Sequence, residues 1–420
     1  MFNRTYARDF FVVNRWMLMC AGLWRPETKN KYIQFFYTVY AVTVFVFVNL
    51  WFTFTEFVSL FYTYKDKYEL IKNVNFFLTH LMGALKVIFW YFYGNFLVEI
   101  MKTLEDPQLQ YESYKHYQPG EISHKYKKTG MRNSLLFLSL AHATLISSYI
   151  PPTVSVLQYI RHGENMDNST MSLPSRLPYY SWMPFSYNTG YTYLLAVAYQ
   201  AGPMFSYAYS IVGMDTLFMN LMNCVAGNVT IIQGAFLTLR ERCISRSDSI
   251  SLSHNTLYEN ELLMTSMKIE IKKIIKHLQI TFKACEKLES IHRYVTLSQV
   301  TATLFILCTC LYLVSMAPPL GKQFLTECVY MAAMFFQLFL YCWFGNEVTL
   351  KFQELPTYIW QSDWIATDSF FKKIMMFTMM RARRPVFFTA GKFSPLTLPT
   401  FMAIIKTSYS IFALIKNTTS

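Results

Sequence analysis

The sequence is poor in charged residues. Asp, Glu, Lys and Arg make up 15% of its 420 residues, whereas hydrophobic residues make up 53%. Soluble domains usually contain about a quarter charged residues, so this chain is too apolar for a set of soluble domains and too long for one small core. The composition predicts an all-α, polytopic membrane protein, because helices satisfy their own backbone hydrogen bonds in lipid.

Catalytic motifs are also missing. The chain contains no HExxH, GxSxG, GxxxxGK[ST], GxGxxG or CxxC pattern. One ExxH pair, Glu289 and His292, stands alone, whereas a di-iron site needs a second pair and further carboxylates. We therefore predict that the protein is not an enzyme and holds no metal or cofactor.

The eight cysteines form no extracellular disulfide framework, since most fall in apolar runs or in segments predicted to face a reducing compartment. The N-terminus lacks a signal-peptide pattern, so we expect the first span to act as its own signal. Seven apolar runs are long enough to cross a membrane, at residues 34–62, 73–100, 133–160, 189–222, 294–316, 324–349 and 396–415.

The distribution of Lys and Arg gives the orientation. With a cytoplasmic N-terminus, the inner segments hold 29 of the 38 basic residues and the outer segments hold 7. This bias predicts a cytoplasmic N-terminus and an extracellular C-terminus, which is the reverse of a G-protein-coupled receptor. The basic residues follow the topology and form no single stripe, so the net charge of +13 does not indicate a nucleic-acid partner.

The spans divide the chain into five predicted regions. Residues 1–222 hold the N-terminal segment and spans one to four, with an extracellular loop at 161–188. Residues 223–293 form a cytoplasmic loop and anchor helix, residues 294–349 hold spans five and six, residues 350–395 form a cytoplasmic anchor and hinge, and residues 396–420 form the last helix.

A stretch without Gly or Pro, from about Leu257 to Pro318, predicts one long helix that extends the fifth span into the cytoplasm. Apolar residues recur along it at heptad spacing. This seam consists of Met267, Ile271, Ile274, Leu278, Thr281, Cys285, Leu288 and His292. It could pack within one subunit or between subunits; we favour an anchor that joins several subunits, together with a hinge helix at about 367–380.

The last span carries a polar face at helical spacing, on which Leu414 is the only bulky apolar residue. One interpretation is a pore lining with a hydrophobic constriction; the other is a helix packed through small polar residues. The candidate pore and gate residues are Thr407, Ser410, Ile411, Leu414, Asn417 and Thr418. Lys406 lies on the same face, about two turns inward of Leu414.

The outer halves of spans two, three, four and six combine aromatic side chains with a few hydroxyls, which suits a volatile or lipophilic ligand; plain helix packing is the alternative. The candidate pocket residues are Phe77, His80, Leu81, Thr144, Ser147, Ser148, Tyr191, Tyr199, Tyr330 and Met334. The outer loop contains the glycosylation sequon at Asn168 and a cluster of Pro and aromatic residues that could form a lid.

Many residues in the last sixty match one family at fixed spacing. They are Trp364, Lys372, Lys373, Met379, Met380, Arg381, Arg384, Pro385, Ala390, Gly391, Lys392, Phe393, Leu398, Thr400, Phe401, Lys406, Ser408, Tyr409, Ser410 and Phe412. With this tail the chain resembles the insect odorant receptor family, as a tuning receptor. Gustatory receptors are similar here but end in a TY…QF pattern, where this chain has Ser408-Tyr409 and no Gln-Phe.

The resemblance implies a tetrameric, ligand-gated, non-selective cation channel in the plasma membrane of an olfactory neuron dendrite. Its implied partners are a volatile odorant, co-receptor subunits in a heterotetramer (or further copies of itself), membrane lipid and cations. It also implies a ligand pocket in the outer half of the bundle, a cytoplasmic anchor and a gate at Leu414. The alternatives are a gustatory-type channel and a transporter of lipophilic molecules, and a transporter would show internal repeats and broken helices.

Epitope tags placed at the two termini test the topology. In intact cells we expect antibody to reach the C-terminal tag and to reach the N-terminal tag only after permeabilisation, because the basic residues hold the N-terminal side in the cytoplasm. Surface labelling of the N-terminal tag in intact cells would contradict the orientation and restore the G-protein-coupled alternative.

Overall fold

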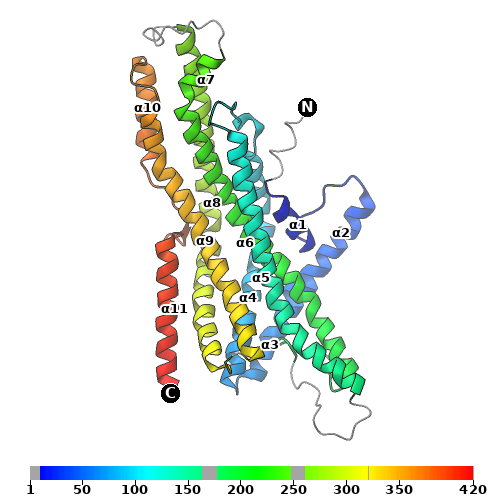
Figure 1. Ribbon diagram of the computed structural model, residues 1–420. Helices are drawn as coiled ribbons and strands as arrows, with labels where there is room; N and C mark the ends of the chain where they lie inside the picture. Colours follow the sequence, from blue (N-terminus) through cyan, green and yellow to red (C-terminus); the bar gives the residue numbers. More distant parts are fainter. Residues whose placement is uncertain (1–9, 163–176, 247–260, 320, 420) are drawn as a thin grey trace.

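The computed structural model describes residues 10–162, 177–246, 261–319 and 321–419, with the backbone alone for residues 162, 418 and 419. Long helices run along one axis, and the C-terminal helix stands beside them (Figure 1). The elements are α1 (Val12–Cys20), α2 (Lys31–Val44), η2 (Phe45–Phe52), α3 (Thr53–Thr63), α4 (Lys67–Leu104), η3 (Pro107–Leu109), α5 (Pro119–His162), α6 (Gly190–Leu237), α7 (Leu239–Ser245), α8 (Glu261–Met316), α9 (Lys322–Gln361), α10 (Ser369–Ala382), β1 (Thr389–Ala390), β2 (Ser394–Pro395) and α11 (Leu398–Thr419).

Six of the described helices are long and apolar enough to span a membrane, and α6 passes the same test together with α7 across a bend of 66°. The prediction of seven spans is therefore confirmed. α2, η2 and α3 together form the first span, Lys31–Thr63. The predicted glycosylation residue, Asn168, lies outside the described residues.

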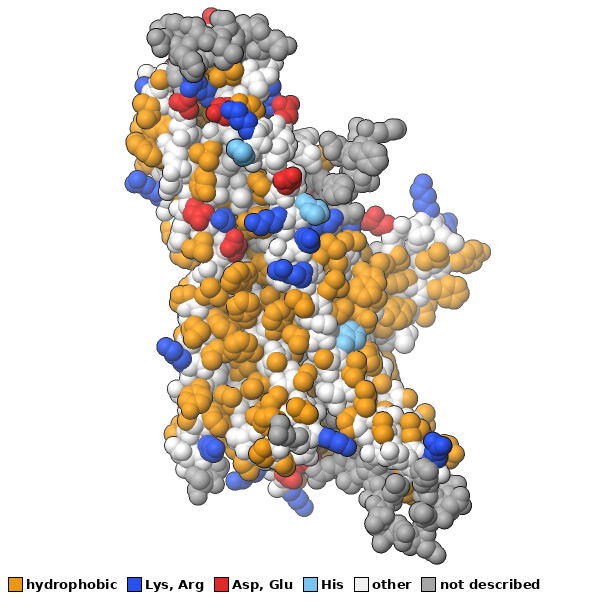
Figure 2. All heavy atoms as spheres, viewed as in Figure 1, with side chains coloured by type: hydrophobic (Ala, Val, Ile, Leu, Met, Phe, Trp, Pro, Cys, Tyr) orange, Lys and Arg blue, Asp and Glu red, His pale blue; other side chains and the backbone are white. Residues whose placement is uncertain are grey.

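Several helices are much longer than a membrane is thick. α8 has 56 residues, which corresponds to roughly 84 Å at 1.5 Å per residue, against about 30 Å for the hydrocarbon core. Figure 2 shows the result on one face: hydrophobic side chains cover the middle of the molecule, and charged side chains gather around the ends of α7 and α8 and beside α10. One end of the bundle therefore projects into water.

A buried ion pair ties three spans together at their centre. Lys86 of α4 lies 2.5 Å from an oxygen of Asp215 on α6, and both side chains are almost fully buried. Two groups of α9 also donate to Asp215: the Tyr341 hydroxyl, at 2.8 Å, and the Gln337 amide. These donors satisfy the carboxylate, as a charge inside a membrane protein requires.

The heptad seam of α8 packs inside its own subunit. All eight of its residues, from Met267 to His292, are buried in the single chain, and α8 packs chiefly against α4, α9 and α6, besides the last helix. The seam therefore stabilises the subunit, and the expectation that it joins several subunits is wrong for this face of α8. Spacing alone could not reveal this, since an apolar stripe fits any apolar partner.

An ion-pair cluster joins α7 to α8 in the projecting end. Arg242, which is fully buried, donates to Glu270 at 2.5 Å and to the carbonyl of Ala235 at 2.9 Å. Arg246 donates to the other oxygen of Glu270 at 3.0 Å. Burial would raise the pKa of the Glu270 carboxyl, but hydrogen bonds and charge from the two arginines lower it below its ordinary value. The carboxylate thus remains charged and holds α7 against α8.

The predicted hinge helix is α10, which begins where the Asp368 side chain accepts the N–H of Phe371 at 2.8 Å. The chain then passes through the pair β1 and β2 to α11. Gly391 at this turn has a φ of +62°, and a Cβ there would lie 2.6 Å from Leu297 of α8. Only glycine fits this close approach, which holds the turn against α8.

Replacing Lys86 alone should destabilise the protein. Lys86→Met leaves the Asp215 carboxylate buried without its cation, at an expected cost of about 3–5 kcal/mol. In the double variant Lys86→Met/Asp215→Asn no charge is left without its partner and the amide oxygen can still accept from the Tyr341 hydroxyl, so much of the loss should be recovered. Melting temperatures of the detergent-solubilised protein measure both, and additive losses would argue against the pair.

Candidate functional site

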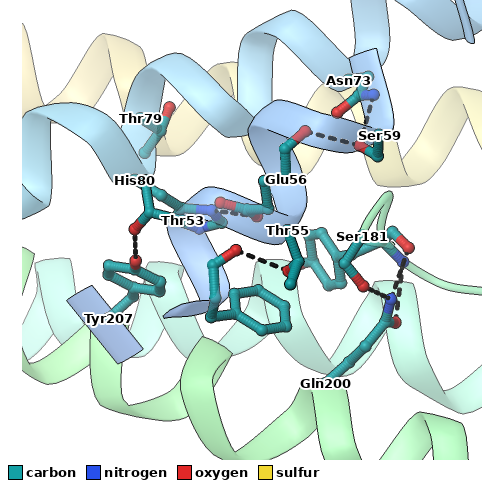
Figure 3. A network of polar contacts seen from close by, with 12 residues as sticks. Thr53, Thr55, Glu56, Ser59, Asn73, Thr79, His80, Ser181, Gln200 and Tyr207 are labelled. Carbon is teal, nitrogen blue, oxygen red and sulfur yellow. Dashed lines mark hydrogen bonds and ion pairs between the residues drawn. The ribbon is translucent and has the colours of Figure 1, made fainter. Parts of the chain in front are cut away.

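The half of the bundle that lies away from α7 and α10, which the predicted topology places outside the cell and which we call the outer half, contains a buried polar cluster that involves α3 and α4 (Figure 1). Glu56 of α3 is 1% exposed, and one of its oxygens lies 2.7 Å from Nδ1 of His80 on α4. The imidazole stacks on the ring of Tyr207 of α6, with centroids 4.4 Å apart. Figure 3 shows Glu56 and Tyr207 on different sides of His80. The cluster thus joins three spans through one histidine.

The hydrogen-bonding pattern of the first span changes from α-helical to π-helical just before this cluster. Residues Phe45–Phe52 form a π-helix, η2, and α3 follows directly. The Tyr207 hydroxyl donates to the carbonyl of Val48 at 2.9 Å and also contacts the Thr53 hydroxyl. This bond satisfies a buried phenol beside the π-helix, and π-helical turns occur often at functional sites.

A second set of polar contacts continues from α4 to α8 and α9. Thr79, next to His80, shares a hydrogen bond of 2.7 Å with the Tyr330 hydroxyl of α9. The side-chain oxygen of Asn75 accepts from the Thr309 hydroxyl of α8 at 2.6 Å, and the backbone carbonyl of Asn75 accepts from the Tyr330 hydroxyl at 3.2 Å. The outer parts of α3, α4, α8 and α9 are thereby linked through hydrogen bonds.

A cavity of about 490 Å³ opens above this cluster, between the α3–α4 turn and the loop segment 177–187. Its walls combine Ser59, Tyr62, Asp66 and Glu69 with aromatic residues of the loop, among them Tyr179. The size suits a small organic molecule. We call this space the outer cavity.

The loop segment is held down by Gln200 of α6. Its amide donates to the Tyr179 carbonyl and to the Ser181 hydroxyl, each at 2.7 Å, and its oxygen accepts the N–H of Tyr179 at 3.4 Å. The N–H of Trp182 donates to the Thr55 carbonyl at 3.0 Å. The described part of the predicted lid is therefore ordered against α3 and α6, and the Tyr179 ring forms the floor of the outer cavity.

The ten candidate pocket residues differ in how deeply they are buried. His80, Thr144, Tyr330 and Met334 are buried, and Phe77, Leu81, Ser147, Ser148 and Tyr199 are half-buried. Tyr191 is 71% exposed at the start of α6 and does not join the cluster. None of the ten lines the described wall of the outer cavity; His80 and Tyr330 lie in the polar contacts beneath it.

Glu56, Tyr149 and Tyr207 were not predicted from the sequence, and Tyr179 was predicted only as one of the aromatic residues of the outer-loop lid. A signal for Glu56 was present, because it is the only charged residue between 34 and 62, and an acid within a span marks a functional site by default. Nothing in the spacing distinguishes the three tyrosines from the other tyrosines among the 30 in the chain.

Helix α11 shows one face to its own subunit and the other to its surroundings. Phe401 packs against Phe335 and Phe339 of α9, with centroids 5.0 and 5.7 Å apart, and the Ser408 hydroxyl donates to the Leu304 carbonyl of α8 at 3.2 Å. The exposed side chains lie on the opposite face: Met402, Lys406, Thr407, Tyr409, Ser410, Leu414 and Asn417.

Four of the six candidate pore residues lie on that exposed face: Thr407, Ser410, Leu414 and Asn417. Leu414 is 65% exposed. Ile411 is half-buried and lies towards the bundle, and the side chain of Thr418 lies outside the described residues. The polar face of α11 therefore points away from its own subunit.

This sequence and architecture match a known protein family. The profile of the family described as 7tm Odorant receptor matches residues 67–409. The chain belongs to the 7tm odorant receptor family. The solved structure of the insect olfactory receptor OR5 from Machilis hrabei is similar, with a TM-score of 0.71 at 14% identity, over 97% of this chain and 99% of that one. The same receptor in complex with eugenol matches with the same score and identity over 98% of each chain.

Curated relatives agree with the family. Odorant receptor 94a of Drosophila melanogaster is 22% identical over 57% of this receptor and 58% of its own length. Odorant receptor 10 of Aedes albopictus is 24% identical over 35% of this receptor and 39% of its own length. The receptor thus spans about half the length of the curated relatives it matches. The receptor is a multi-pass membrane protein, and its relatives are odorant receptors, not enzymes.

Gln200 provides a test of the ordered loop. Gln200→Leu removes three hydrogen bonds from segment 177–187, so backbone amides there should exchange hydrogen at least several-fold faster, as measured by mass spectrometry. The control is Gln233→Leu on the same helix, since Gln233 donates to the Lys351 carbonyl at 2.8 Å, in the projecting end. Equal exchange in wild type and Gln200→Leu would show that Gln200 does not order the segment.

Proposed function

We propose that this receptor is a ligand-binding subunit of an odorant-gated, non-selective cation channel. The channel is a tetramer with a shared co-receptor, or of this chain alone, in the plasma membrane of an olfactory neuron dendrite. A volatile ligand binds in the outer half of the bundle, and four copies of the last helix surround the pore. Family membership favours this function over a gustatory-type channel or a transporter of lipophilic molecules.

The observation that carries the proposal is the exposed face of α11. A helix surrounded by lipid should be apolar around its whole circumference, and polar groups at membrane depth face protein or water. Here Lys406, Thr407, Ser410 and Asn417 share the face that the subunit leaves uncovered. If several subunits surrounded a water-filled axis, this polar face would contact water and protein in place of lipid.

Leu414 is the gate in this arrangement. Leucine side chains that meet around an axis form a narrow apolar ring, which expels water and stops ions. Asn417 lies about one turn outward and Ser410 about one turn inward, so the ring has wettable residues on both sides. Lys406 lies further inward, where its long side chain can extend towards the cytoplasmic mouth.

The cytoplasmic anchor would use a different surface from the heptad seam. Phe370, Phe377 and Met380 of α10 are exposed although large and apolar. Next to them, a groove of about 510 Å³ runs between α8 and α10 and is lined by apolar residues with Gln279 and charged residues at its edges. Exposed apolar surface in water marks interfaces, so we assign this surface, within regions 223–293 and 350–395, to contacts between subunits.

Ligand binding can reach α11 through α8 and α9. The polar contacts beneath the outer cavity include Tyr330 of α9 and Thr309 of α8, and these two helices provide the packing surface for α11. A ligand that prefers one arrangement of the outer helices shifts the closed–open equilibrium by its difference in affinity for the two states. The eugenol complex of the related receptor supports a small volatile molecule as the ligand.

Leu414→Ala should produce current without odorant. The smaller side chain widens the apolar ring and lets water enter, so we expect basal conductance to rise several-fold in cells that express the receptor with and without the co-receptor. Ile415→Ala is the control, because Ile415 is half-buried on the bundle side of the same helix. Unchanged basal conductance and unchanged odorant responses in Leu414→Ala would remove Leu414 from the gate.

A further inference from the structure

The polar cluster beneath the outer cavity leaves specific groups unpaired. Oε1 of Glu56 pairs with His80, but Oε2 is buried and has no hydrogen-bond partner among the described residues. The same holds for the hydroxyl of Tyr149 on α5 and for Oδ1 of Asn73 on α4. Buried polar groups are nearly always paired, and each exception calls for an explanation.

These groups lie around one place. The imidazole that pairs with Glu56 stacks on Tyr207. The N–H of Trp182, three residues after Tyr179, donates to the carbonyl of Thr55, next to Glu56, and the Tyr179 ring packs against Tyr149. Asn73 donates to the Ser59 hydroxyl at 2.8 Å, and that hydroxyl donates to the Glu56 carbonyl at 2.7 Å. Figure 3 shows Asn73 beside Ser59, next to Glu56.

The unpaired groups are mainly acceptors. Glu56 is paired with the His80 imidazole at 2.7 Å, and a carboxylate in such a pair can only accept; the Asn73 amide orientation is fixed by its neighbours. The hydroxyls of Ser59 and Thr63 already donate to backbone carbonyls, so they must accept from Asn73, whose NH₂ group faces them and leaves Oδ1 unpaired. A molecule that fits this place must therefore bring a donor.

The outer cavity leads to the cluster. Ser59 and Tyr179 both line the cavity. On its inner side, the Tyr179 ring packs against Tyr149 and Phe76, with centroids 5.4 and 4.7 Å apart. The Tyr179 ring therefore lies between residues that line the outer cavity and the side chains of the cluster.

We propose that Glu56 and Tyr149 form the polar end of the ligand site, and that the site prefers small molecules that donate a hydrogen bond, alcohols or amines, over molecules of equal size that only accept. The apolar body of the ligand packs against Phe76 and Tyr179, and its O–H or N–H points at Glu56 Oε2. This inference rests on the proposed function, since it specifies the ligand of the same site.

The test uses two ligand series, each matched in size. The probes are 1-hexanol, hexylamine, methyl pentyl ether and heptane, and benzyl alcohol, benzylamine, anisole and ethylbenzene. Currents are recorded with the co-receptor, and ligand-induced thermal stabilisation is measured on the purified receptor. We expect the alcohol or the amine of at least one series to bind at least about tenfold more tightly than its ether, as a hydrogen bond to a charged group implies. The alcohol and amine arms identify which donor the site takes.

Two variants localise the preference. Glu56→Gln keeps the shape but presents an N–H in place of an acceptor, so the ratio of alcohol to ether affinity should fall about tenfold. Tyr149→Phe makes a smaller change in the same direction and serves if Glu56→Gln does not fold. The control is Glu347→Gln on α9, because the Glu347 carboxyl lies outside the cluster and accepts from the Tyr126 hydroxyl of α5 at 3.4 Å; it should leave the ratio unchanged.

The outcomes separate this inference from the channel. Donor-selective stabilisation without current would support the ligand class and contradict the proposed channel function. Odorant-gated current with equal responses to alcohols, amines and ethers would overturn the inference and leave the channel intact. An unaltered ratio in both Glu56→Gln and Tyr149→Phe would also overturn it, because the preference would then arise elsewhere.

Discussion

The ion pair between Lys86 and Asp215 fixes the centre of the bundle. Two opposite charges buried in a membrane protein must stay together, since separating them leaves each without compensation. Tyr341 and Gln337 add α9 to the same point. The spans are thus fastened at mid-height, so movements of the outer halves must take place as tilts or rotations about this point.

The polar contacts of the outer half have a different character. Glu56, Asn73 and Tyr149 keep groups that the described protein does not satisfy, whereas Asp215 accepts from two side chains of α9 besides its cation. A satisfied network rigidifies its surroundings, and a partly satisfied one can change its partners. The receptor therefore combines a fixed middle with an adaptable outer end, and α4 and α9 contribute residues to both.

Much of the fold could be predicted because membranes restrict structure so strongly. Long apolar runs predicted the spans, a stretch without Gly or Pro predicted the extent of α8, and helical spacing identified the uncovered face of α11. The partner of each face could not be predicted: the α8 seam, from Met267 to His292, would suit another subunit as well as its own. The ligand site was harder to predict, because its aromatic residues resemble those of any hydrophobic core. Tyr191, for example, is an aromatic residue of the kind that lines pockets, but it is exposed.

The π-helix η2 affects how this receptor can be compared with its relatives. A π turn closes its hydrogen bond one residue later than an α turn, so everything after Phe52 is rotated relative to a straight α-helical span. An ungapped alignment with a relative whose first span is α-helical throughout would pair Glu56 with a residue on a different side of that helix. Counting acids at the aligned position would then miss relatives that place one at the same point in space, and a structural superposition is the sounder basis for tracing this residue through the family.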